Sequence, residues 1–505
     1  MKKVSKGNQK SRFGQLSEAA FLITQDYLSY SKTRSGSLKS TMPGAFLHMN
    51  REILRLAIPN ILSNISVPLL SSFDTYLMGG LGPLHIAAIG LGSMAFNFVY
   101  WNCGFLRMAG TGLTAQAYGR KDEQEMAGVL ARGLLVGGVL AALFVLLQTY
   151  ILQGTEALLD IQADQRSLVS AYFYIRIWAA PAALGLMVLF GWFFGMQNAV
   201  FPLILTLLIN VVNMGLSYYM VHHLDWGVSG VAWGTVIAQY VGVLAGAGLL
   251  AWRYGWVIKG LRSTRILVRD KLFDFLRLNG DILVRTICLT LSFALFYNWA
   301  NGAEATAVVA ANVILLQLIN WMSYGVDGFA FAAESLVGKY FGAQSDVFLS
   351  DDSQNHQKEK LLFSRGFHLR KSIQLSFVWG MGLAIIYALI YWLLGGRIVE
   401  WFAPAEAAPE ALAAARSYLP LISVFCLLAT PCYIYDGVFV GLTAARALRD
   451  TMLLAFAGYL LTYFLWGQYY GNWGLWITLT AFMVYRTIFQ FLWMKPLMRR
   501  TTSGP

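Results

Sequence analysis

Long apolar runs recur along almost the whole chain, and short polar connections separate them. An apolar helix of about 20 residues is long enough to cross a lipid bilayer. The pattern therefore predicts an all-α integral membrane protein with twelve spanning helices. The runs fall at about 53–78, 86–113, 127–152, 171–196, 201–222, 227–252, 275–299, 306–336, 370–394, 415–441, 451–469 and 472–494.

The composition agrees with a membrane protein of many spans. Of the 505 residues, 57% are hydrophobic and only 13% are charged, whereas soluble domains have roughly 45–50% and 25%. The mean hydropathy is +0.55. The four cysteines, Cys103, Cys288, Cys426 and Cys432, all lie in apolar runs without metal-type spacing, which predicts buried thiols.

Basic residues lie almost entirely on one side of the predicted spans. One set of connections holds twenty Lys and Arg residues: 119–126, 253–277, 338–371, 442–450 and 495–505. The opposite set holds only Arg166 and Arg397: 79–85, 153–170, 223–226, 300–305 and 395–414. Because connections rich in Lys and Arg stay in the cytoplasm, we expect a multi-pass protein of the cell inner membrane with both termini cytoplasmic.

A long basic connection divides the twelve spans into six and six. The expected parts are a tail at 1–48, an N-lobe at 49–252, a cytoplasmic linker at 253–274, a C-lobe at 275–494 and a tail at 495–505. The first tail carries eight basic and two acidic residues, which is typical of a disordered segment on anionic lipid. A second interpretation stays open, because MNREILRL at 49–56 resembles a natural start and the tail is then an upstream extension.

The two halves contain a weak internal repeat. At an offset of 223, the segment 85–119 matches 308–342, with Asn97 on Asn320 and Gly119 on Gly342. At an offset of 246, the segment 172–195 matches 418–441, with Tyr172, Gly191 and Gly195 on Tyr418, Gly437 and Gly441. Repeats of six spans have the same orientation, which predicts two lobes related by a pseudo-two-fold axis along the membrane normal. This design favours a carrier that alternates access by rocking its lobes.

The first span carries an acid, Asp74, near its outer end. A charged carboxylate in hydrocarbon is costly, so it favours a bound proton or cation. We expect three polar residues of spans five and six to lie at a similar depth: Asn213, Ser217 and Thr235. Asn210 shares one helix face with Asn213 and Ser217 and is a further candidate for the coupling site. Alternatives stay open, because Asp74 could reach interfacial water and amides often only link membrane helices. Pro59 predicts a kink in the same span, either static or coupled to protonation.

The C-lobe holds more charge than the N-lobe. Opposite charges in its spans predict a polar network with a structural or gating role, although direct ion coupling stays possible: Asp281, Arg285, Asp327, Glu334, Asp436 and Arg486. Asp281 and Arg285 are spaced as an i, i+4 pair. Arg107 in span two has no evident acidic partner at its depth.

Motifs of several enzyme classes are absent from the sequence. It has no GxxxxGK[ST] phosphate loop, HExxH zinc motif or GxSxG elbow. His222 and His223 are the only candidates for membrane-surface catalysis, and they are also typical interfacial residues. We therefore expect no enzyme activity, no metal and no cofactor.

The ordered motifs resemble a family. LAIPNILSNISVPLLSSFDTYLMGGLG, AAIGLG and GTGLTAQAYGRKD resemble the start of multidrug and toxic compound extrusion (MATE) transporters. VDGFAFAAESLVGKYFGA and YDGVFVGLTAARALRDTM resemble its DinF branch. The resemblance covers about 50–495 and implies a two-lobed antiporter that exports amphipathic, often cationic compounds in exchange for protons or sodium. It also implies that Asp74 carries the coupling ion and that bending at Pro59 is linked to protonation.

The resemblance also exposes one departure from the family. The family's N-lobe cation site combines the first-span acid with an Asn and an Asp in span five and a Thr in span six. Asn213 and Thr235 match, but Ser217 replaces the second acid. One carboxylate suffices for a proton and offers sodium fewer hard oxygen ligands, so protons are favoured over sodium.

These observations predict a proton-coupled multidrug exporter. The expected partners are small amphipathic or cationic substrates, the coupling proton or sodium and membrane lipids, with no nucleic acid, and we expect a monomer. The alternative is a lipid-linked oligosaccharide flippase of the same superfamily. It would need a strongly cationic cavity, for which this sequence offers few unpaired cations.

Overall fold

The computed structural model describes residues 42–159, 161–263, 268–349, 355–402 and 409–503, and these residues form helices and short turns without any strand. The predicted disordered tail at 1–48 lies outside the described residues up to position 41. The helices are α2 (Met42–Gly79), α3 (Pro83–Asn102), α4 (Phe105–Arg120), α5 (Glu123–Leu146), α6 (Gln148–Leu159), α7 (Ala163–Arg176), α8 (Ala180–Gly195), α9 (Val200–His222), α10 (Gly227–Arg253), α11 (Gly255–Ser263), α12 (Arg269–Ala303), α13 (Thr306–Leu349), α14 (Asn355–Phe402), α15 (Pro409–Gly441), α16 (Ala445–Leu465) and α17 (Gly471–Ser503).

Eleven helices of the described residues are long and apolar enough to cross a membrane. They coincide with eleven of the twelve predicted spans. The remaining predicted span, 451–469, corresponds to α16, whose first two turns carry Arg446, Arg449 and Asp450. These charges lower its apolar character, yet α16 packs along α12 and α17 like its neighbours. All twelve predicted spans lie in the second of two compact units, Met1–Glu52 and Ile53–Pro505.

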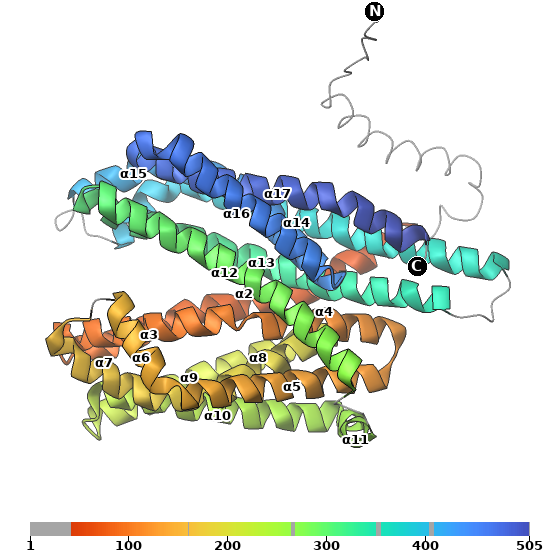
Figure 1. Cartoon of the computed structure of the whole chain (residues 1–505), viewed down its shortest axis with the longest axis horizontal. Helices are drawn as coiled ribbons and strands as arrows, with labels where there is room; N and C mark the ends of the chain where they lie inside the picture. The colour runs from red at the N-terminus through yellow and green to blue at the C-terminus, as the bar shows by residue number, and fades with distance from the viewer. Residues whose placement is uncertain (1–41, 160, 264–267, 350–354, 403–408, 504–505) are drawn as a thin grey trace, which may run out of the picture. The chain divides into compact units, whose positions relative to one another are not determined.

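The second unit contains two groups of helices. Figure 1 shows α3 to α10 together along one side and α12 to α17 along the other. The groups correspond to the predicted N-lobe and C-lobe, and we use these names below. The four cysteines are buried and free, as the sequence predicts.

Close glycine contacts confirm the internal repeat. A Cβ atom on Gly191 of α8 would lie 2.4 Å from the carbonyl oxygen of Arg107 on α4. A Cβ atom on Gly437 of α15 would lie 2.1 Å from the carbonyl oxygen of Ala330 on α13. The offset of 246 relates Gly191 to Gly437, and the offset of 223 relates Arg107 to Ala330, so the two contacts are equivalent. Because both lobes therefore pack the same helices through the same positions, the weak sequence matches reflect a structural repeat.

The lobes meet in a nearly symmetric seam. A Cβ atom on Gly119 of α4 would lie 2.0 Å from the carbonyl oxygen of Lys339, and one on Gly342 of α13 would lie 2.1 Å from that of Gln116. The offset of 223 relates these two contacts to each other. Such close backbone approach requires glycine. We call this contact, at the end of the unit where α4 meets α5 and α11, the inner seam.

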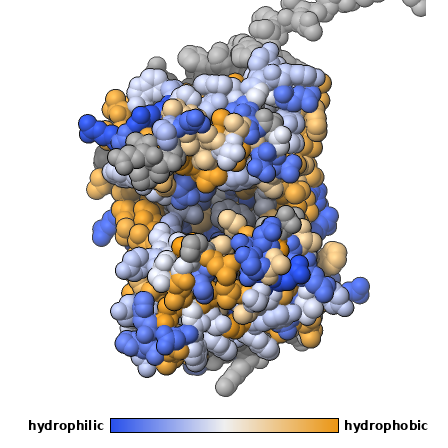
Figure 2. Space-filling view, turned by 90° about the vertical axis from the view of Figure 1, so that its left-hand side faces the viewer, coloured by the Kyte–Doolittle hydropathy of each residue, from blue (hydrophilic) through white to orange (hydrophobic). Residues whose placement is uncertain are grey.

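The opposite end of the second unit is more open. Figure 2 views this end and shows the surface hollowed between the two lobes, with polar residues around the hollow and apolar residues on the flanks. Asp74 lies in the last turns of α2, on the side of the unit away from the inner seam. The two lobes thus contact each other at the inner seam and are separated by the hollow at the opposite end.

We expect Gly437→Ala to lower the stability of the C-lobe. The new methyl group would meet backbone rather than a flexible side chain, and such overpacking costs about 1–3 kcal/mol. Gly382→Ala is the matched control, because nothing lies within 4 Å of a Cβ atom there. Melting of both purified variants in detergent measures the difference, and equal melting temperatures would contradict the proposed close contact.

Candidate functional site

Asp74 lies at the outer end of α2, and no residue that the structure describes forms an ion pair with it. Its neighbours Leu77 and Met78 are buried in an apolar cluster with Phe96 and Phe173, which fixes this part of α2 against the N-lobe. Asp74 itself is half-buried, and its Oδ1 atom is buried without a hydrogen-bond partner. No ion pair joins Asp74 to another residue in the described part of the chain. The carboxylate is therefore free to bind a proton or a ligand.

The predicted polar residues of α9 and α10 bond to one another. Asn213 Nδ2 donates to Thr235 Oγ1 at 2.8 Å, and Ser217 Oγ donates to Asn213 Oδ1 at 3.3 Å. Asn213 and Ser217 are fully buried. A Cβ atom on Gly234 would lie 2.4 Å from Ser217 Oγ, so the two helices approach closely here. A larger acidic side chain would not fit at position 217 without a shift of α10.

The structure separates the five predicted coupling residues. Asn213, Ser217 and Thr235 form one cluster, and no hydrogen bond within the described residues connects this cluster to Asp74. Asn210 binds α2 at a different level, because its Nδ2 donates to Ser66 Oγ at 3.1 Å. The α2 helix continues through Pro59 and Pro68, and bending at Pro59 remains a prediction.

Arg176 is a residue of this site that the sequence analysis missed. It ends α7, and it is the charged group whose field acts on Asp74. Its guanidinium lies over the rings of Phe96 and Tyr100, at 5.4 and 5.7 Å from their centroids. Its Nη1 atom is buried and has no hydrogen-bond partner. A basic residue inside the apolar run 171–196 was the signal that could have identified it.

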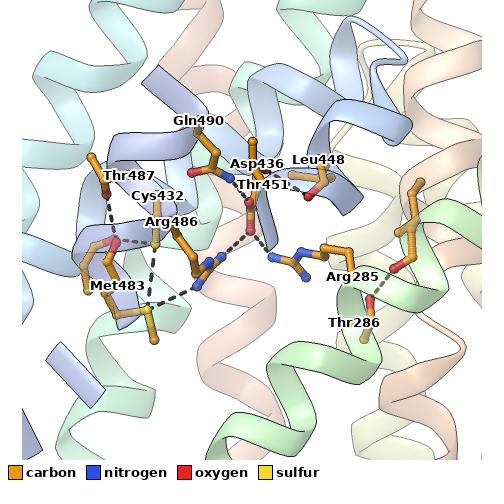
Figure 3. Close-up of polar contacts among 12 residues, drawn as sticks. Arg285, Thr286, Cys432, Asp436, Leu448, Thr451, Met483, Arg486, Thr487 and Gln490 are labelled. Carbon is orange, nitrogen blue, oxygen red and sulfur yellow. Dashed lines mark hydrogen bonds and ion pairs between the residues drawn. The ribbon is translucent and has the colours of Figure 1, made fainter. Parts of the chain in front are cut away.

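The centre of the C-lobe network is Asp436 on α15. Figure 3 shows that Arg285 from α12 and both Arg486 and Gln490 from α17 point toward its carboxylate. Arg486 Nη2 lies 2.7 Å from Asp436 Oδ2, Gln490 Nε2 donates to Oδ1 at 2.6 Å, and Arg285 pairs with Oδ2. All four residues are buried. The cluster ties three helices of the C-lobe together and contains three of the six residues of the predicted network, Arg285, Asp436 and Arg486.

Two expectations from the spacing of charges need correction. Asp281 does not pair with Arg285 one turn away, because Arg449 of α16 binds it at 2.5 Å. Arg107 does have an acidic partner: its Nη1 lies 3.5 Å from Glu334 Oε2, and its guanidinium stacks 3.9 Å above the Phe331 ring. Glu334 and Phe331 belong to α13, so this ion pair crosses from the N-lobe to the C-lobe. Helix depth alone could not reveal either pair.

Polar contacts reinforce the inner seam beside this ion pair. Gln116 of the N-lobe donates to the carbonyl oxygen of Gly441 at 2.9 Å. Gln197 donates to the carbonyl oxygen of Ser335 at 2.9 Å, and Ser335 donates to that of Phe194 at 2.8 Å. Asp327, which lies deeper in α13, has no ion pair with any residue that the structure describes, although Arg107, Arg285 and Arg486 act on it electrostatically. The charges of Glu334 and Arg107 thus lie where the lobes close.

We expect Glu334→Gln to loosen the inner seam. The change leaves the partly buried Arg107 without its counter-charge, which favours states in which more water reaches it. Ser335 is buried beside the pair, so a Ser335→Cys reporter should react several-fold faster with a membrane-impermeant maleimide in the Glu334→Gln background. Arg416→Gln, which removes an exposed pair with Glu400, is the control. Equal rates in all backgrounds would contradict a sealing role for the pair.

Comparison with known proteins identifies the family. The MatE family model matches residues 59–219. The DNA damage-inducible protein F of Escherichia coli K12 is 33% identical over 454 residues, which cover 88% of this chain and 91% of that protein. The chain belongs to the MATE family, in its DinF-like branch. A probable multidrug resistance protein NorM from Pseudomonas syringae is also similar, at 24% identity over 79% of this chain and 82% of that protein.

Solved MATE structures share the fold. The outward-facing conformation of a multidrug resistance MATE family transporter matches with a TM-score of 0.76 at 17% identity, over 90% of this chain and 97% of that chain. A MATE structure in the bent conformation matches with a TM-score of 0.77 at 17% identity, over 91% and 99%. The predicted fold of twelve helices in two lobes is thereby confirmed.

Family membership makes the chain a multi-pass membrane protein of a transporter family. The alternative of catalysis at His222 and His223 gains no support from their surroundings. Both are exposed at the end of α9, and their rings pack against Tyr218 and Tyr219 at 4.7 and 5.3 Å. Among the described residues, no group of three or more His, Cys, Asp or Glu side chains could hold a metal ion.

Proposed function

We propose that this MATE-family protein is a secondary active antiporter that exports small amphipathic or cationic compounds in exchange for protons. It would lie in the cell inner membrane with both termini in the cytoplasm, and its two lobes would alternate access to a central cavity. The observation that carries the proposal is Asp74, a half-buried carboxylate with an unpartnered oxygen on α2. A group with this environment can exchange a proton for a cationic substrate.

The surroundings of the other acids support Asp74 as the coupling group. In the C-lobe, Asp436 and Glu334 have arginine partners, so neither carboxylate is free for exchange without leaving an unpaired cation. Asp327, which has no ion pair among the described residues, is the remaining candidate of the C-lobe. The N-lobe amide and hydroxyl groups near position 213 bond to one another. A sodium ion would need several oxygen ligands together, whereas one carboxylate suffices for a proton. We therefore favour protons as the coupling ion.

Protonation would act on the conformational equilibrium of α2. Neutral Asp74 no longer needs polar or charged partners, and a state that buries it becomes favourable. In the outward-open state, proton binding would thus displace a cationic substrate and bias the lobes toward the next step of the cycle.

Efflux of a fluorescent organic cation from proteoliposomes tests the proposal. Either a pH gradient or a sodium gradient is imposed, and never both. Transport that follows the pH gradient alone is the expected result. Transport driven only by sodium would overturn the proton assignment. If neither gradient drives transport and the protein instead binds a polyprenyl-pyrophosphate glycan, the multidrug function itself would be contradicted in favour of the flippase alternative.

A further inference from the structure

Asp74 and Arg176 carry opposite charges in the N-lobe, yet they do not form an ion pair. No contact within ion-pair distance joins them, although both border one apolar cluster: Phe73, next to Asp74, packs against it, and the guanidinium of Arg176 lies over its Phe96 ring. Each side chain keeps one buried polar atom without a hydrogen-bond partner, Asp74 Oδ1 and Arg176 Nη1. Buried polar groups normally have partners. Two opposite charges that are near but separate can therefore respond to what binds beside them.

Aromatic packing fixes the position of Arg176. Its guanidinium lies over Phe96 and Tyr100, which attract a cation through their ring faces. Phe96 in turn stacks on Phe173 of α7 at 5.0 Å. The same cluster receives Phe73 and Leu77, the neighbours of Asp74 on α2. The positions of both charges are thus set by one packed cluster rather than by a bond between them.

The polar side chains that the helices place around Arg176 include two tyrosines. Tyr100 of α3 lies under its guanidinium, and Tyr172 of α7 packs on Phe96. Helix α9 contributes Val221 to the same apolar cluster, and α10 contributes Val228, Val231 and Ala232. Arg176 is therefore the fixed positive charge of the site.

We propose that Arg176 determines which ion the site exchanges, because its guanidinium already supplies the positive charge that balances ionised Asp74. When Asp74 is ionised, the two side chains together are neutral, so a sodium ion would bring excess positive charge into a desolvated place. An amphipathic organic cation offsets this cost by burying its apolar part, which a compact sodium ion cannot do. A proton neutralises the carboxylate itself and needs no oxygen shell. Arg176 thereby excludes sodium while still allowing protonation. This inference rests on the proposed function, because it assigns the ion selectivity of the same site.

Binding of radioactive sodium to the purified protein at about pH 8 tests this selectivity. We expect wild type to bind sodium weakly and Arg176→Gln to bind it at least about tenfold more tightly. The gain should disappear in the double variant Arg176→Gln/Asp74→Asn. Arg176→Lys, which keeps the charge, should behave like wild type. If Arg176→Gln binds sodium no better than wild type, or if the gain persists without Asp74, the proposal is overturned.

A second variant covers the case in which Arg176→Gln does not fold. Arg176→His carries a charge at about pH 5.5 and is neutral at about pH 8, because histidine titrates near pH 6.5. Its sodium affinity should therefore exceed that of wild type only at the higher pH. The same ratio of variant to wild-type affinity at both pH values would contradict the proposal. Proton-driven efflux by wild type is measured separately. If wild type shows no proton-driven efflux, the proposed function is contradicted, whereas the sodium-binding result tests only the role of Arg176.

Discussion

Asp74→Asn should abolish proton-driven efflux while the protein still reaches the membrane. Asparagine matches the shape of aspartate and keeps the contacts of Leu77 and Met78 with the N-lobe cluster, but it cannot bind or release a proton. Efflux under a pH gradient should fall to the level of protein-free liposomes. The measurement is substrate efflux from proteoliposomes that hold equal amounts of wild type or variant.

Matched changes of the neighbouring polar cluster separate coupling from packing. Asn213 and Thr235 bond to each other and not to Asp74, so Thr235→Val should lower stability while leaving proton dependence in place. Efflux by Asp74→Asn at the wild-type rate would show that the coupling group lies elsewhere. A variant of Thr235 that loses proton coupling without losing stability would place the coupling group in the α9–α10 cluster.

Asp436→Ala should strongly destabilise the C-lobe. The change leaves Arg285 and Arg486 buried without the carboxylate that binds both. Removing one partner of a buried ion pair costs about 3–5 kcal/mol. We expect low yield and a sharply lower melting temperature in detergent. The same loss should appear without substrate or gradient, because it concerns the fold and not the transport cycle.

Asp450 provides the control for this prediction. Its side chain is about half-exposed and pairs with Arg449, and such pairs contribute about 0–1 kcal/mol. Asp450→Ala should therefore leave the melting temperature nearly unchanged. Combining Asp436→Asn with Arg285→Gln should recover part of the lost stability by removing a stranded charge. Equal stability of Asp436→Ala and Asp450→Ala would show that the arginines are solvated rather than buried.

The fold followed from the sequence because its determinants are periodic. Apolar runs set the spans, and the weak repeat matched Gly191 with Gly437, which the structure places in equivalent contacts with backbone. The predicted span at 451–469 also followed, although Arg449 and Asp450 make α16 less apolar than the other spanning helices. These features depend on local composition and on spacing, which a single sequence contains.

The partners of the charged residues could not be read in the same way. Asp281 faces Arg449 instead of Arg285, and Arg107 pairs with Glu334 across the lobes. Such pairs depend on which faces of distant helices meet, and span depth does not fix helix rotation. The environment of Asp74 was likewise only half predicted. The sequence indicated the acid, but the aromatic packing that places Arg176 near it is a tertiary feature.

Proton release on substrate binding tests the central claim most directly. The purified protein is mixed with a cationic substrate in a weakly buffered solution below neutral pH, and a pH indicator records protons set free. If substrate and proton compete at Asp74, wild type should release up to one proton per bound substrate and Asp74→Asn should release none. Substrate binding by wild type without proton release, or equal release by both proteins, would contradict exchange at Asp74.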